Sequence, residues 1–151
     1  MKEGIDMDEM VKNILQLNFK EAKKICDKAE YDLLRGTILK EAYETSYISF
    51  ILFVQYMVIE DKREFWTDLL IECLIGPFCH LDGAYLAAYY LSKKVLQEKK
   101  IVSNYEQILF FANVPEISKD VFSKTEIKVY ASELLKLDSK NKIAQRILYG
   151  Y

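Results

Sequence analysis

The chain contains little proline, glycine, cysteine or histidine. Its 151 residues include 2 prolines, 5 glycines, 3 cysteines and 1 histidine. The single histidine excludes a di-iron helical site, because such a site needs two Glu-x-x-His pairs. The cysteines, Cys26, Cys73 and Cys79, are odd in number and have no disulfide-framework spacing. We therefore interpret them as free thiols of a protein from a reducing compartment.

The chain also lacks an excess of charge of either sign. It carries 21 basic and 23 acidic residues, for a net charge of −2. The summed electrostatic field therefore gives no argument for DNA, RNA or an anionic membrane as partner. A basic partner is favoured slightly.

No apolar run is long enough for a membrane span. The best candidate, residues 47–59 (YISFILFVQYMVI), has 13 residues and is interrupted by Ser49 and Gln55, whereas a spanning helix needs about 20. The first ten residues lack the basic start and apolar stretch of a secretory signal. We expect a cytoplasmic protein in which this run forms a buried core helix.

Helix signals are abundant along the chain. At four places an N-cap residue is followed three positions later by Glu or Gln, namely Asn18 with Glu21, Asp61 with Glu64, Asn104 with Gln107, and Ser123 with Glu126. Apolar residues recur between them at spacings of three and four. These patterns predict about eight helices and no strand, with the helices at residues 6–17, 19–29, 31–59 (one long helix or two in tandem), 61–76, 82–95, 104–113, 124–137 and 141–149.

The length and composition indicate a single all-helical domain over residues 1–151. With 51% hydrophobic residues, a chain of this length buries roughly two-thirds of the surface that it exposes when unfolded. Short loops between the predicted helices favour antiparallel neighbours, in a closed bundle or in a stack of helical hairpins. We favour the stack, packed around the apolar helix that contains residues 47–59.

The reason for this preference lies near the C-terminus. The segment ASELLKLDSKNKIAQRILYG, residues 131–150, resembles the junction between two tetratricopeptide repeats. In that family a small alanine lets the helices nest and an Asp-containing turn stops the first helix, roles that Ala144 and Asp138 match, with Leu148 on the next helix. Ser139 departs from the pattern, because the family has proline there. The resemblance implies hairpin stacking at this end of the chain.

A looser resemblance extends over the whole chain. Its tyrosine-rich middle, the GAYLAAYYL helix at residues 83–91 and the terminal LLKLDSKNKIAQRIL hairpin are similar to those of small helical immunity proteins of bacterial polymorphic and contact-dependent toxin systems. The resemblance implies a non-catalytic protein that binds one cognate toxin domain, often a nuclease, and covers or distorts its active site.

Residues capable of catalysis or metal binding form no known motif. Cys73, Cys79 and His80 match no standard zinc spacing. Asp68 and Glu72 lie one helical turn apart, which suits acid–base work or half of a metal site, but a solvated helix face is the simpler interpretation. We expect no catalytic residue, no metal and no cofactor.

The segment from residue 68 to residue 89 is the predicted partner-binding region. It joins an acidic helix face to a loop and then to tyrosines that belong either to the surface or to the core. Its predicted contact residues are Asp68, Glu72, His80, Asp82, Tyr85 and Tyr89. The first hypothesis for the partner is a cognate toxin domain. The alternatives are a helical-repeat adaptor that binds peptides, and a small helical enzyme that binds a ligand or metal.

Overall fold

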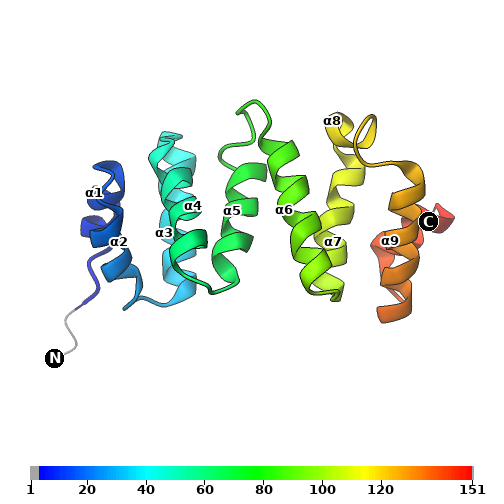
Figure 1. Cartoon of the computed structure of the whole chain (residues 1–151), viewed down its shortest axis with the longest axis horizontal. Coiled ribbons are helices and arrows are strands. Elements are labelled where there is room, and N and C mark those ends of the chain that lie inside the picture. The colour runs from blue at the N-terminus through cyan, green and yellow to red at the C-terminus, as the bar shows by residue number, and fades with distance from the viewer. Residues whose placement is uncertain (1–3, 151) are drawn as a thin grey trace. The chain divides into compact units, whose positions relative to one another are not determined.

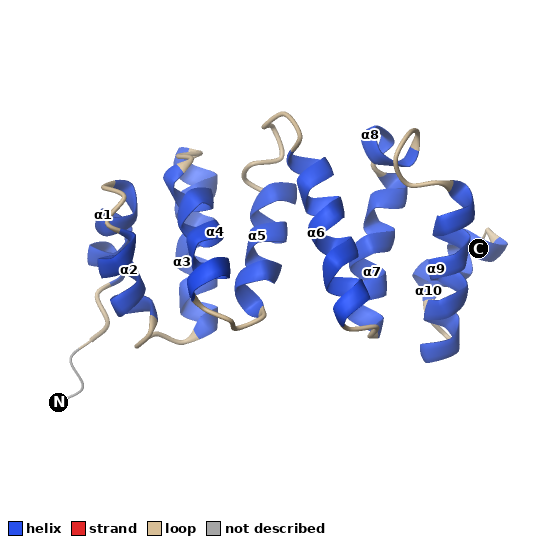
Figure 2. Ribbon diagram, viewed as in Figure 1, coloured by secondary structure: helices blue, strands red, loops and turns tan. Residues whose placement is uncertain are grey.

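The computed structural model describes residues 4–150 and is all-helical over them, with 73% of residues in helix and no strand (Figure 2). This confirms the predicted fold class. The chain divides into two compact units, Met1–Ala84 and Tyr85–Tyr151. The prediction of a single domain stays a prediction, because the division concerns packing and not cooperativity of folding. Each unit is described by itself below.

The first unit consists of five helices (Figure 1). They are α1 (Met7–Leu15), α2 (Phe19–Cys26), α3 (Tyr31–Thr45), α4 (Ser49–Glu60) and α5 (Phe65–Ile75). The helix α4 packs against α1, α2 and α5, and α3 packs against α5. The side chains of α4 that are completely buried are Phe50, Phe53, Val54 and Met57. The apolar run of residues 47–59 therefore contributes one buried side to the core of this unit, and is not buried all round as predicted.

Residues 31–59 form two helices in tandem rather than one. The break falls at Ser46, whose φ of 54° places it in the left-handed region and ends α3. The chain turns there, and Tyr43 and Tyr47 are largely exposed, at 62% and 56%. Because the break redirects the chain, the two tyrosines do not share the buried side of α4, which carries Phe50, Val54 and Met57.

The second unit is built on α6 (Ala84–Glu98), which begins at the boundary. It continues with α7 (Val102–Phe110), the 3₁₀ turn η1 (Phe111–Asn113), α8 (Pro115–Ser118), α9 (Lys124–Leu137) and α10 (Lys142–Tyr149). The helix α9 packs against both α7 and α10, and α8 packs against η1. In the hairpin of α9 and α10, α9 has the predicted bounds, α10 begins one residue later than predicted, and Ala144 is completely buried. Its likeness to a tetratricopeptide junction stays a prediction.

Two of the four predicted helix starts were right. Ser123 is the N-cap of α9 and accepts a hydrogen bond from the Glu126 N–H. Asn18 is the N-cap of α2, although its side chain makes no capping hydrogen bond. Asp61 instead ends α4, and Asn104 lies inside α7, where its amide donates to the Lys99 carbonyl at 2.7 Å. The described residues hold ten helices rather than about eight, since residues 31–59 divide in two and the short α8 precedes α9.

Candidate functional site

The predicted acidic pair lies on α5, and one of its members is bound to a neighbouring helix. The Arg35 guanidinium on α3 donates through Nε to Glu72 Oε2 at 2.9 Å and through a second nitrogen to Glu72 Oε1. The two side chains are 44% and 36% exposed. Burial and the Glu72 carboxylate raise the pKa of the adjacent Tyr31. Glu72 thus helps to join α3 to α5, while Asp68, one turn earlier, is exposed.

The predicted loop residues His80 and Asp82 are exposed in the turn that follows α5. Phe78 is completely buried and anchors this turn, with its ring 6.5 Å from the His80 ring. Gly83 has a φ of +80°, a backbone conformation that L side chains rarely adopt. The loop therefore presents His80 and Asp82 to solvent in a fixed turn.

The predicted tyrosines belong to the second unit and differ in burial. Tyr85 is half-buried, and Tyr90, next to Tyr89, is exposed. Tyr89 is only 1% exposed, so it is a core residue and is not available to a partner. This corrects its assignment as a contact residue and selects the core alternative. The physical reason is that its ring packs between Phe111 and Phe122, at centroid distances of 5.7 and 5.2 Å.

Polar groups surround this aromatic core in the second unit. Lys93 Nζ donates to Glu126 Oε1 at 2.8 Å, and the Tyr130 hydroxyl donates to the same oxygen at 3.3 Å. The Tyr105 hydroxyl donates to Glu133 Oε2 at 2.8 Å. These contacts join α6 and α7 to α9. The side chains of Lys93 and Tyr105 are therefore engaged in hydrogen bonds between helices.

The titration behaviour of this cluster supports a structural role. Burial, with the hydrogen bond to Glu133 as a smaller cause, raises the pKa of Tyr105 to about 12. Burial also raises the pKa of Tyr89 and Tyr130, and the hydrogen bond to Glu126 raises the pKa of Lys93. Groups with such pKa values stay protonated near neutral pH. Such protonated groups do not act as bases.

The thiols divide into two buried residues and one exposed residue, all unpaired. Burial raises the pKa of both Cys26 and Cys73 to about 12. These two thiols are therefore protonated and poor nucleophiles. Over residues 4–150, no three His, Cys, Asp or Glu side chains lie close enough to hold a metal ion. Within the same range, no helix has the length and apolar character needed to cross a membrane.

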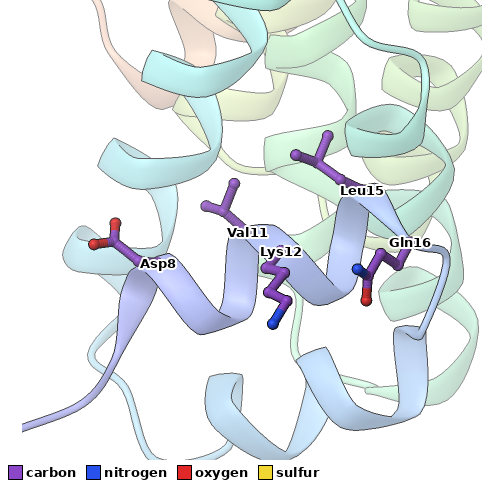
Figure 3. Close-up of a pocket in the computed structure, with 5 residues that line it drawn as sticks. All are labelled: Asp8, Val11, Lys12, Leu15 and Gln16. Atoms are coloured by element: carbon purple, nitrogen blue, oxygen red, sulfur yellow. The ribbon is translucent and has the colours of Figure 1, made fainter.

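A shallow hollow of about 360 Å³ lies along α1. Four residues of that helix and its C-cap line it, namely Asp8, Val11, Lys12, Leu15 and Gln16. Val11 and Leu15 point to one side of the helix, and Lys12 and Gln16 to the other (Figure 3). Because one helix and its C-cap provide all the lining, the hollow is an open surface feature and does not enclose a ligand.

The outward face of α4 exposes several large apolar residues. Ile48, Leu52 and Ile59 are 58%, 46% and 59% exposed. With the exposed Gln55, they follow one another at intervals of four, three and four residues, which confines them to a sector of about 60°. Ile51, Tyr56 and Val58 flank this sector and are half-buried. We call these seven residues the α4 face.

We expected α4 to be covered by neighbours on several sides. The structure differs because its neighbours cover only the opposite side, which carries Phe50, Phe53, Val54 and Met57. The predicted contact residues therefore did not include the α4 face. Its signal in the sequence is the recurrence of Ile48, Leu52 and Ile59 on one stripe, separate from the stripe of the core residues.

No protein-family model matches the chain, and no curated protein or solved structure matches it significantly.

Proposed function

We propose that this protein is not an enzyme and that it acts by binding another protein. The observation that carries this proposal is the α4 face, an uncharged and largely apolar helix surface in contact with solvent. Contiguous apolar patches on a protein surface mark interaction sites, whereas apolar residues exposed singly are ordinary. The raised pKa values of the buried thiols and phenols agree with this proposal, because they leave these groups protonated.

Within this class we propose an immunity protein that binds and neutralises a cognate bacterial toxin domain. The whole-chain resemblance described above supports this choice. The slight acidic excess, 23 acidic against 21 basic residues, also suits a basic toxin, such as a nuclease, whose active site must attract nucleic acid.

The test is affinity purification of the tagged protein from its native host, followed by mass spectrometry. We expect one toxin-like domain to co-elute in an amount comparable to the tagged protein. Expression of that domain alone should stop growth, and co-expression of this protein should restore it. Peptides from several unrelated proteins would favour the adaptor instead. An eluate without any protein partner would contradict the proposal.

A further inference from the structure

The small net charge of the chain hides a difference between its two units. Residues 1–84 include 10 basic and 16 acidic residues, whereas residues 85–151 include 11 basic and 7 acidic residues. The second unit is therefore basic, although the charge summed over the whole chain gave no argument for an anionic partner. A charge difference between parts of a chain is one signal of contact with nucleic acid or a membrane.

Six of these 11 basic residues gather at one end of the second unit. The turn between α6 and α7 and the turn between α9 and α10 both lie there (Figure 2). Hydrogen bonds join them, since the Tyr105 hydroxyl donates to Glu133 at 2.8 Å and the Asn141 amide donates to Glu106 at 2.7 Å. We call residues 98–106 and 133–146 the basic end. Its exposed basic residues are Lys99, Lys100, Lys136, Lys140, Lys142 and Arg146.

The acidic residues of the basic end are set back from its surface, with one exception. Glu106, Glu133 and Asp138 are half-buried, and each accepts a hydrogen bond from a side chain of the same unit. Glu98 is exposed. Within these two described ranges, six cations and one carboxylate are therefore exposed to solvent.

Helix stability does not account for all of this charge. Lys136 lies in the last turn of α9, where a cation is favourable because the C-terminal end of the helix dipole is negative. Lys142 is instead the first residue of α10, where a cation is unfavourable. The position of Lys142 is therefore better explained by a role outside the helix.

Aliphatic side chains are exposed among the same cations. Ile101, Leu137 and Ile143 are 39%, 53% and 41% exposed. Each directly follows a lysine of the basic end in the sequence. A positive charge and an apolar group thus occur together at three places on this surface.

This mixture favours one kind of anionic partner. Nucleic acids are bound mainly through charge and through stacking of bases on aromatic rings, which leaves the three aliphatic side chains without a role. Acidic peptides are bound in grooves or along sheet edges, whereas these side chains lie at turns between helices. An anionic membrane interacts with both kinds of side chain, because its headgroups attract cations and its acyl boundary accepts aliphatic groups.

We propose that the basic end binds the surface of an anionic membrane. The lysines and Arg146 lie at the headgroups, and Ile101, Leu137 and Ile143 enter the boundary between headgroups and acyl chains. Because three partly exposed aliphatic side chains bury little area, the binding is reversible and depends strongly on salt. The inference goes beyond the proposed function, since it involves no toxin.

Vesicles provide a defined test with the full chain. The probes are vesicles of phosphatidylcholine alone and vesicles that also contain about 30% phosphatidylglycerol, an anionic lipid. We expect the chain to co-sediment with the anionic vesicles at low salt and to be released as salt is raised. Phosphatidylcholine vesicles should retain at least about fivefold less protein.

A matched pair of variants locates the charged contact. Lys142 and Arg146 are the first and fifth residues of α10, and Lys124 and Lys128 hold the same positions in α9. We expect Lys142→Glu/Arg146→Glu to weaken binding to the anionic vesicles by at least about tenfold. Lys124→Glu/Lys128→Glu, with the same change in net charge, should weaken it by less than about threefold.

A second pair tests the aliphatic contact. Leu137 and Leu33 are 53% and 46% exposed, and Leu33 belongs to the first unit. Leu137→Gln should weaken vesicle binding by about threefold or more, whereas Leu33→Gln should leave it unchanged. Thermal unfolding by circular dichroism checks that each variant is folded.

Several results would overturn the inference. They are failure to bind anionic vesicles at low salt, equal binding to phosphatidylcholine vesicles, and unchanged binding of folded Lys142→Glu/Arg146→Glu. Tighter binding of a single-stranded oligonucleotide or a glutamate-rich peptide, per negative charge, would assign the basic end to that partner instead. Self-association at low salt that Lys142→Glu/Arg146→Glu abolishes would assign it to the acidic unit of a second copy. None of these results bears on toxin neutralisation, so the proposed function is tested separately.

Discussion

At the residue scale, the buried hydroxyl of Tyr89 is a polar group without a hydrogen-bond partner in the described part of the chain. Such a group costs free energy, while its ring contributes packing with Phe111 and Phe122. We expect Tyr89→Phe to leave the free energy of unfolding unchanged or to raise it by up to about 1 kcal/mol.

Tyr105→Phe is the matched control, because its hydroxyl donates to Glu133 at 2.8 Å. It should lower the free energy of unfolding by about 1 kcal/mol. Urea unfolding of both variants gives the comparison. If Tyr89→Phe lost more free energy of unfolding than Tyr105→Phe, the assignment of the Tyr89 hydroxyl as unpartnered and the Tyr105 hydroxyl as hydrogen-bonded would be contradicted.

Asp61 should make stability depend on pH in the acid range. Hydrogen bonds from the Arg63 side chain, the Arg63 N–H and Trp66 Nε1 lower the pKa of Asp61 from 3.8 to about 2. Because the folded pKa lies below the unfolded value, the stabilisation is present above about pH 4 and is lost as the pH falls toward 2. We expect it to be about 1 kcal/mol, since Arg63 is half exposed.

Urea unfolding of the natural chain and of Asp61→Asn, measured from pH 6 downward, tests this expectation. The difference in stability between the two proteins should shrink between about pH 4 and about pH 2. A difference that stayed constant over this range would show that the Asp61 carboxylate does not carry the effect.

At the scale of the element, the helix caps should differ in strength. Ser123 accepts from the Glu126 N–H, and Asn141 accepts from the N–H groups of Ile143 and Ala144. Ser123→Ala should cost about 1 kcal/mol of unfolding free energy. Asn141→Ala should cost more, because Asn141 also donates to Glu106 on α7 at 2.7 Å. Asn18→Ala should cost only a few tenths of a kcal/mol, since Asn18 makes no cap bond. Equal losses in chemical denaturation would refute this ranking.

Replacement of each of the two glycines near the Arg35–Glu72 pair by alanine should change the free energy of unfolding in opposite directions. A Cβ on Gly36, inside α3, meets nothing within 4 Å, whereas a Cβ on Gly76 would lie 2.8 Å from the Glu72 carbonyl oxygen and close to the Tyr43 hydroxyl. We expect Gly36→Ala to raise the free energy of unfolding by about 0.5–1 kcal/mol. We expect Gly76→Ala to lower it by about 1–3 kcal/mol. Thermal or urea unfolding measures both, and a stabilising Gly76→Ala would contradict the close packing at this turn.

Element bounds could be predicted from the sequence where local chemistry decides them. The helix α9 has its predicted bounds because the Ser123 hydroxyl reaches the Glu126 N–H. The same pattern failed at Asn104, whose amide reaches the Lys99 carbonyl, and at Asp61, whose carboxylate is held by Arg63 and Trp66. In both cases another partner competed for the side chain, and a pattern of residue types does not register that competition.

At the scale of the whole molecule, the all-helical class could be predicted from the periodicity of apolar residues and the scarcity of proline. Which side chains are exposed on the surface could not be predicted in this way. The helix α4 has apolar residues nearly all round, so its periodicity could not show which side the neighbours cover. Tyr89 and Tyr90 are adjacent residues of the same type, yet only Tyr89 is buried. Such distinctions depend on the packing of several helices, which one sequence does not encode in a local pattern. The contact role of Asp68, Glu72, His80, Asp82 and Tyr85 stays a prediction.

The most direct test of the account compares three tagged proteins in the native host: the natural chain, Leu33→Lys and Leu52→Lys. We predict that the natural chain and Leu33→Lys each retain one toxin-like domain and restore growth when that toxin is expressed. Folded Leu52→Lys should lose both properties. If the natural chain retained no protein partner, or retained one without protecting the cell from it, the proposed function would be contradicted.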